Sequence, residues 1–355
     1  MHFAIEQRIA NFKRYYNRIN ERPLLGFFLD SEYPLRRYRA SASLPEDRPL
    51  QPDDFRCEDY LADNERLFNL HEEAGGDFIW AASAFWGIPW LEVMLGCDIF
   101  ADHKTGSIQA RAPSVITVFE FDPGSEWAQK VVQFLRTFAQ RSNGRYPLAG
   151  TRMRGIADLL AAVFGNELFI YKLLEEPDQM KQLCERLTDV WIAFGKFQLE
   201  QIPLFHGGVG SFYYNMWAPP ESLWHQEDAA SLLNPGLYRE FIEPCDRRIA
   251  QSFGGCFMHM HPTGFYPYEQ LLDASMTVLE LHIDAGGPSA EQLFDVHKDI
   301  LAHKPMLIWG DICDEDLEWI FLNLPRRGLA VQKVVKNAQE AEDVWSRSER
   351  LWNRR

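Results

Sequence analysis

Two histidines, His259 and His261, stand two residues apart in the otherwise apolar stretch Gly254–Gly264. Cys, Phe and Met fill the positions around them, as in a buried parallel strand whose successive side chains alternate between two faces. Both imidazoles are therefore predicted on one face, near the carboxyl end of the strand, because Pro262 and Gly264 end it. Two such rings could bind one divalent metal or hold a substrate carboxylate, phosphate or carbonyl. The alternative is that each ring satisfies backbone groups in the interior.

A second stretch, Met276–Asp284, carries polar residues at alternate positions. Glu280, His282 and Asp284 are predicted to share one face of a buried strand. Three polar groups on such a face are costly unless they are paired, so they are either satisfied core groups or site groups. Asp284 lies nearest the strand end and is predicted to be catalytic.

The stretch Pro305–Cys313 repeats this pattern, with its polar residues at the end. Asp311 is predicted to be a second catalytic residue. Asp284, Asp311 and Cys313 are the candidates for a third metal ligand, since zinc accepts carboxylate and thiolate as well as imidazole. A loop carboxylate and a buried thiol are the structural alternatives for the last two.

Other residues at the ends of earlier apolar runs are predicted to contact a substrate. Arginines offer charged hydrogen bonds to an anion, hydroxyl and amide groups offer neutral ones, and tryptophan offers an apolar wall. A solvated loop side chain or a core aromatic is the alternative in each case. The predicted substrate contacts are Asp30, Arg36, Trp86, Arg152, Arg154, Tyr213, Tyr214 and Asn215.

Strand-like and helix-like segments alternate along the chain and place these residues at successive strand ends. This alternation, without a dinucleotide-binding glycine motif, favours an α/β fold of the closed (β/α)8 TIM-barrel type over an open doubly wound sheet. The predicted strands are Leu24–Leu29, Asp77–Gly87, Tyr146–Gly155, His206–Asn215, Cys256–His261, Met276–Asp284, Pro305–Cys313 and Leu329–Val335. The predicted helices are Ile5–Ile19, Tyr60–Ala74, Trp127–Arg141, Ile156–Phe164, Glu176 to about Ile202, Pro235 to about Phe253, Ala290–His303 and Ala338–Trp352.

The domain prediction is a single barrel over residues 1–355 with surface insertions at about 41–56 and 99–121. The second insertion is expected to contain a hairpin, especially over Ser114–Phe121. A hydrophobic content of 46% supplies a large core for one such domain.

The charge and the cysteine pattern bound the partners. A net charge of −15 argues against nucleic acid or an anionic membrane as the main partner, so a small-molecule substrate is expected. No apolar stretch approaches the roughly 20 residues that span a bilayer, and no signal peptide is recognised. The scattered cysteines show no CxxC pair, which fits a cytoplasmic protein with reduced thiols.

Several motifs from about residue 145 onward share the spacing of one known family. They are Arg154-Gly155-Ile156 with its helix to Gly165, Leu173–Asp178, Asp228 before Asn234–Pro244, His259-x-His261 with Gly264, and Trp309-Gly310-Asp311. In these the chain resembles the uroporphyrinogen decarboxylase superfamily, which includes zinc- and corrinoid-linked methyltransferases. Weaker similarity extends back to the first strand. The resemblance implies a TIM-type barrel with its site at the carboxyl ends of the strands.

The two branches of this superfamily fit the chain unequally. Decarboxylases place an Asp at the end of the strand that here reads Phe78–Gly87, where no Asp follows Asp77, so porphyrinogen decarboxylation is disfavoured. In the methyltransferases a His-x-Cys pair and a distant Cys hold zinc. His259 and His261 match the pair, the distant Cys is missing, and a carboxylate is the candidate replacement. The resemblance implies zinc as cofactor, and a corrinoid-linked substrate or a corrinoid protein as partner.

Three functions follow from this sequence. The first is metal-assisted methyl transfer to a thiol or corrinoid-linked acceptor, with the histidine pair holding the metal. The second is a metal-free decarboxylase or lyase that grips a porphyrinogen-like polycarboxylate through the predicted arginines. The third is a ligand-binding barrel without catalysis.

Overall fold

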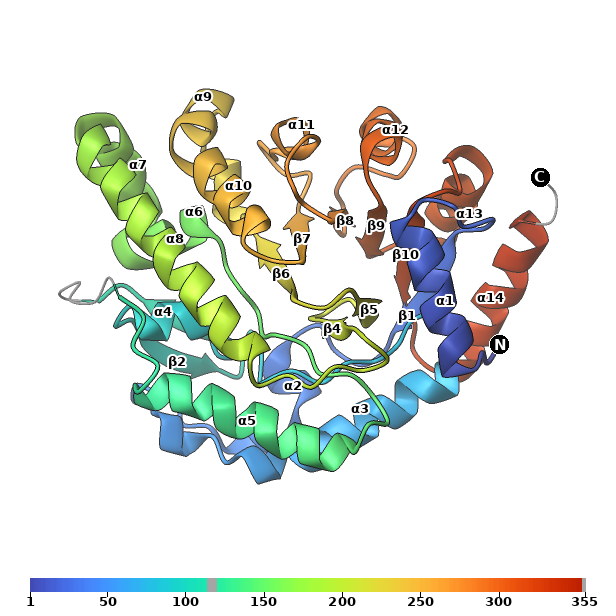
Figure 1. Ribbon diagram of the computed structural model, residues 1–355, viewed down its shortest axis with the longest axis horizontal. Coiled ribbons are helices and arrows are strands. Elements are labelled where there is room, and N and C mark those ends of the chain that lie inside the picture. The colour runs from blue at the N-terminus through green and yellow to red at the C-terminus, as the bar shows by residue number, and fades with distance from the viewer. Residues whose placement is uncertain (114–119, 353–355) are drawn as a thin grey trace.

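The regular part of the computed structural model is a sheet of six parallel strands in the order β1-β10-β9-β8-β7-β6 (Figure 1). The structure describes residues 1–113 and 120–352. Nearly every residue of these strands is buried. Helices cover one face of the sheet, and the rest of the chain, mostly loops and short elements, covers the other. The strands are β1 Leu24–Phe28, β6 Ser222–Gln226, β7 Gly255–Met260, β8 Val278–Ile283, β9 Met306–Gly310 and β10 Leu329–Val334.

The strand prediction is confirmed for β1, β7, β8, β9 and β10, whereas β6 was not predicted. Of the other predicted strands, 77–87 and 146–155 contain no regular strand, and 206–215 contains only the short β4, Val209–Ser211, which pairs antiparallel with β5, Met216–Ala218. Isolated parallel bridges link these segments: Ala82 with Leu148, Ala149 with Gly210, and Arg154 with Gln226.

The expected closed barrel therefore needs correction. Within the described residues the six-stranded sheet is compatible with a TIM-like barrel, but no ring of regular strands closes it. Residues 146–155 include Pro147, which cannot donate a ladder hydrogen bond, and Gly150 and Gly155, which weaken a strand. Close packing also occupies these positions, since a Cβ on Gly150 would lie 2.4 Å from Leu223.

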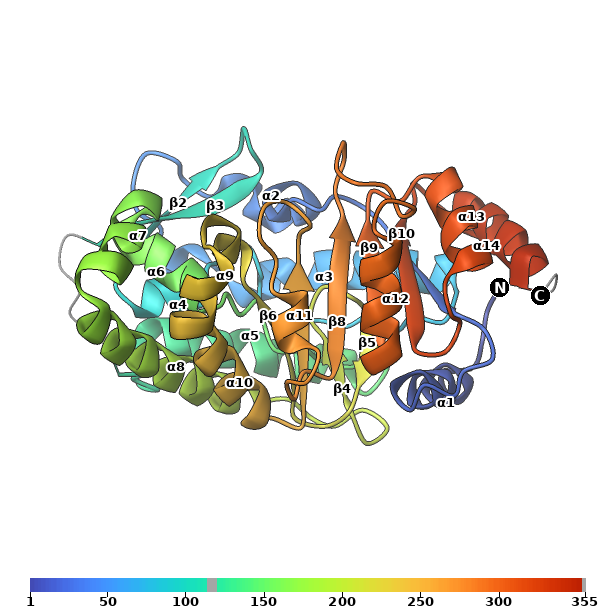
Figure 2. The same ribbon diagram turned by 90° about the horizontal axis from the view of Figure 1, so that it is seen from above.

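Helices follow most strands and lie against one face of the sheet, as α12 does beside β8 and β9 (Figure 2). The longer ones are α1 Ile5–Tyr16, α3 Leu61–Ala74, α5 Glu126–Ser142, α6 Ile156–Phe164, α7 Asn166–Glu175, α8 Pro177–Leu199, α10 Glu243–Gln251, α12 Phe294–His303, α13 Asp314–Asn323 and α14 Ala338–Trp352. The short ones are α2 Pro34–Arg37, α4 Trp90–Met94, α9 Pro235–Leu237 and α11 Tyr268–Leu271. No helix among the described residues is long and apolar enough to cross a membrane.

Two of the longer helices, α7 and α13, were not predicted, and one predicted helix is interrupted. The expected helix over 235–253 consists of α9, a π-helical turn at Tyr238–Ile242, and α10. Pro244 stands at the start of α10, where its missing N–H breaks the regular hydrogen-bond ladder. The wider turn accommodates that break.

The two predicted insertions differ in regularity. Residues 41–56 contain only short 3-10 turns. A hairpin lies in the second region, formed by β2 Asp98–Asp102 and β3 Ser107–Arg111, which pair antiparallel. It precedes the segment where the hairpin was expected, and residues 114–119 of that segment lie outside the described residues.

Candidate functional site

The carboxyl ends of β7 and β8 bring together three histidines and two carboxylates. In the sheet register His259 of β7 lies beside Glu280 of β8, and both point to the inner face. His261 and Asp284 follow the ends of the same strands, and His282 lies two residues beyond Glu280. The three histidines each offer a ring nitrogen, and these atoms lie within 4.8 Å of one another.

Two carboxylates fix the orientation of two of the rings. Nδ1 of His259 hydrogen-bonds to Oε2 of Glu280, and Nδ1 of His261 hydrogen-bonds to Oδ1 of Asp284 at 2.8 Å. The two Nε2 atoms then face each other at 2.9 Å. When each Nδ1 carries a proton for its carboxylate, both Nε2 atoms present lone pairs. Only a proton or a cation between them makes this contact favourable.

The electrostatics favour positive charge at this point. Burial alone would lower the pKa of His259, but the charge and hydrogen bond of Glu280 raise that pKa to about 9. Burial likewise opposes ionisation of Glu280, yet His259 lowers the pKa of this carboxyl to about 2. Glu280 also accepts a hydrogen bond from the Tyr214 hydroxyl at 3.1 Å. The carboxylate is thus held ionised behind the imidazole, as carboxylates are behind metal-bound histidines.

His282 completes the group from a different direction. Its Nδ1 lies 3.5 Å from Oε1 of Glu280, and its ring packs edge-on against Trp309 at 4.5 Å. Gly310 makes room for it, because a Cβ there would lie 2.8 Å from Nε2 of His282 and 2.3 Å from the Ile283 carbonyl oxygen. The φ of Gly310, +127°, also suits glycine.

The histidines form one wall of a cavity of about 290 Å³. Its other lining residues are Glu32, Tyr33, Pro34, Trp86, Ser107, Arg152, Phe212, Tyr213, Trp224, Gln226 and Trp309. Aromatic rings dominate this lining, as in most small-molecule sites. Tyr213 has a φ of +66°, which is strained for a bulky residue. Such strained conformations are concentrated at functional sites.

The predicted site residues divide into those that line the cavity and those that do not. Trp86, Arg152 and Tyr213 line the cavity together with His259 and His261.

Three predicted residues lie behind the cavity lining. Asp284 supports His261 from behind, and Tyr214 similarly supports Glu280. Asn215 is buried, with its side-chain amide 3.3 Å from Nε2 of His71.

Arg154 also lies outside the lining and is already paired. It donates to Glu92 at 2.9 Å and lies 3.6 Å from Asp158. Its guanidinium is therefore neutralised by the protein itself, in contrast to the expectation that it contacts substrate.

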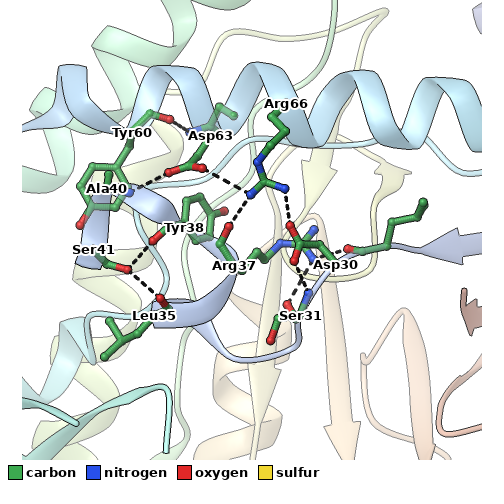
Figure 3. Close-up of polar contacts among 12 residues, drawn as sticks. Asp30, Ser31, Leu35, Arg37, Tyr38, Ala40, Ser41, Tyr60, Asp63 and Arg66 are labelled. Atoms are coloured by element: carbon green, nitrogen blue, oxygen red, sulfur yellow. Dashed lines mark hydrogen bonds and ion pairs between the residues drawn. The ribbon is translucent and has the colours of Figure 1, made fainter. Parts of the chain in front are cut away.

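Three further predicted residues are not part of the cavity lining. Asp30 adopts a φ of +71° and forms an ion pair with Arg66 of α3, which also donates to the Arg37 carbonyl (Figure 3). Arg36 is exposed and donates to the Lys104 carbonyl at 2.9 Å. Asp311 is exposed and is not part of the three-histidine group.

Cys313, a candidate ligand in the sequence, also lies outside the three-histidine group. It is exposed and its thiol lies 3.2 Å from Oδ2 of Asp316 in the first turn of α13. The third imidazole comes instead from His282, whose place in the alternation of 276–284 was visible in the sequence. Choosing the residue nearest the strand end missed it.

Sequence reasoning also missed lining residues from β6 and from the loop after β1. Trp224 and Gln226 alternate on the inner face of β6, so the period of a strand was present. The strand was not predicted because its polar residues, such as His225 and Gln226, interrupt the apolar run. Glu32 follows β1 in a loop, where no periodic pattern indicates the direction of a side chain.

A second group with metal-like spacing lies on the outer face of β6. His225, Glu227 and Asp246 are fully buried together. Glu227 accepts hydrogen bonds from the first two backbone N–H groups of α6, at 2.6 and 3.0 Å. Asp246 lies 2.9 Å from Nε2 of His225 and accepts from the Tyr238 hydroxyl at 2.6 Å. Protein groups therefore already use the oxygens of this outer cluster.

Comparisons with known proteins inform the fold. No family model matches the sequence, and no curated protein matches it, so membership of the uroporphyrinogen decarboxylase superfamily stays a prediction. Among solved structures, a methyltransferase from Methanosarcina mazei is similar, with a TM-score of 0.63 and 10% sequence identity. The match covers 99% of this chain and all of that chain. The chain thus shares its overall fold with that protein.

Proposed function

We propose that this chain is a methyltransferase-like enzyme that holds a divalent metal, zinc in the first instance, through His259, His261 and His282. The methyl group would pass to a small acceptor, a thiol or a corrinoid-linked group, in the adjoining cavity. One domain over residues 1–355 would carry the whole site. The observation that carries the proposal is the 2.9 Å contact between two Nε2 atoms whose Nδ1 atoms are both engaged by carboxylates.

The side chains present fit such an ion. Three imidazoles and an open position form a ligand set of catalytic zinc sites. Glu280 and Asp284 would fix the ring tautomers and raise the basicity of the ligating nitrogens. A zinc ion bound here would lower the pKa of a thiol or water and favour its nucleophilic form.

The remaining groups would bind and shield the acceptor. Trp86, Tyr213 and Trp309 form apolar walls close to the histidines, and they exclude water from the reacting atoms. The alternative function, a metal-free decarboxylase, requires several cations around one substrate. Of the three predicted arginines only Arg152 lines the cavity, so this alternative has less support.

The test is the metal content of untagged protein purified without chelator, measured by mass spectrometry. We expect about one zinc ion per chain. Two variants, His282→Ala and the double variant His259→Ala/His261→Ala, should lose it. His303→Ala, an exposed histidine at the end of α12, is the matched control and should retain the ion. Wild-type protein without metal, whose thermal stability zinc does not change, would contradict the proposal.

A further inference from the structure

An arginine without a counter-ion lines the cavity. Arg152 forms no hydrogen bond or ion pair with any other described residue, and its Nε is buried without a partner. Two residues further on, Arg154 is paired with Glu92 and Asp158. Burial, followed by the charge of Arg154, lowers the pKa of Arg152, and the charges of Glu92, Asp228 and Asp158 act in the opposite direction without forming an ion pair with it.

A carboxylate without a partner lines the same cavity. Glu32 is half-buried and forms no hydrogen bond or ion pair with the other described residues. Burial raises its pKa, the charge of Asp311 adds to that effect, and the charges of His282 and Arg37 oppose it. Charges removed from water in this way cost free energy unless a partner compensates them.

The two charges do not compensate each other. They come from separate segments, Glu32 from the loop after β1 and Arg152 from residues 146–155, and no ion pair joins them. Both charges act on Tyr213: burial, then the charge of Glu32, raises the pKa of its hydroxyl, whereas the charges of Arg37 and Arg152 lower it. The cavity therefore presents one positive and one negative group, each without a direct hydrogen-bond or ion-pair partner, beside the histidines.

We infer that the cavity binds a small zwitterion, with its acid group at Arg152 and its cationic nitrogen at Glu32. Binding of such a ligand does not depend on the proposed function; only the reaction that would follow binding rests on it. A volume of about 290 Å³ lies at the lower end of ligand pockets, which suits a molecule of amino-acid size. The aromatic walls would contact its apolar part, and its free end would face the imidazoles.

The test compares three probes that differ in one charge each. L-methionine carries both charges, L-methioninamide lacks the acid, and 4-(methylthio)butanoate lacks the ammonium group. Binding is measured by calorimetry on the full chain in the presence of EDTA, so that the outcome does not depend on a metal. We expect L-methionine to bind at least tenfold more tightly than either truncated probe.

Two variants assign each charge to its residue. Arg152→Gln should abolish the preference for L-methionine over the amide and retain that over the butanoate, while Glu32→Gln should do the reverse. Arg136→Gln, which removes an exposed arginine of α5 outside the cavity lining, should change neither preference. Equal affinity of wild-type protein for the three probes, or binding of none, would overturn the inference. So would variants that weaken all probes equally.

The outcome is separable from that of the metal experiment. A protein without zinc that still discriminates the probes refutes the proposed function and supports the zwitterion site. A protein with zinc that does not discriminate them does the opposite.

Discussion

The inner cluster of His259, His261 and His282 and the outer cluster of His225, Glu227 and Asp246 share residue types and ligand-like spacing. They differ in what satisfies their polar atoms. Backbone N–H groups of α6 and the Tyr238 hydroxyl occupy the carboxylates of the outer cluster. In the inner cluster two ring nitrogens face each other beside a cavity. Unfilled coordinating capacity, more than spacing, thus distinguishes a candidate metal site from a structural network.

The largest expected difference is in folding stability. Asp246→Ala should lower the free energy of unfolding by about 3–5 kcal/mol, because it leaves His225 and Tyr238 buried without their acceptor. Asp284→Ala removes the corresponding partner of half-exposed His261 and should cost about 1 kcal/mol or less. Urea denaturation of metal-free protein measures both. Equal losses would show that the two clusters have the same structural role.

The metal affinity should respond in the opposite way. Glu280→Gln weakens the support of His259 and should reduce zinc affinity by about 10–100-fold. Glu227→Gln, in the outer cluster, should leave the affinity of the folded protein unchanged. Competition with a chromophoric chelator gives both values, and a loss confined to Glu227→Gln would move the metal to the outer cluster.

Gly310 tests the position of the third imidazole. Gly310→Ala places a methyl group against the Ile283 carbonyl and His282, and should cost about 1–3 kcal/mol of stability together with weaker zinc binding. Gly286→Ala is the matched control, since its φ is +75° but nothing lies within 4 Å of the added Cβ. If both variants bind zinc as wild type does, His282 is not a ligand.

The smallest expected effects come from a pair of tyrosines, one behind each cluster. Tyr214→Phe and Tyr238→Phe each remove a hydroxyl that donates to a carboxylate and should each cost about 1 kcal/mol of stability. Only Tyr214→Phe should also weaken zinc binding, because only Tyr214 contacts Glu280. Denaturation and chelator competition on the same two variants test this, and equal effects on zinc affinity would remove the distinction.

The sequence was most informative where local pattern and tertiary environment agree. Strands β7 to β10 are predominantly apolar runs, and the covered sheet favours that pattern. Alternation grouped His259 with His261, and His282 with Glu280 and Asp284, and in the structure these two groups lie against each other. It did not single out His282 as a candidate ligand beside Asp284, Asp311 and Cys313, because register and ring direction depend on neighbouring strands.

Loop residues defeated the same reasoning. Asp30 and Glu32 are two residues apart after β1, yet only Glu32 lines the cavity, while Arg66 of α3 binds Asp30 (Figure 3). A partner distant in sequence decides which way such a side chain turns. The segments 77–87 and 146–155 were overpredicted as regular strands. In the structure they form only isolated β-bridges, to each other and to the strands that follow.

The three candidate metal ligands and the two carboxylates that support them all lie within residues 259–284, in a single strand–helix–strand unit. Closing so short a loop costs little chain entropy, so an ion could organise this unit before the rest of the chain assembles around it. Arg152 and Glu32 come from segments far away in sequence. If the proposals hold, the segments that select the ligand can therefore vary without any change in the unit that would hold the metal.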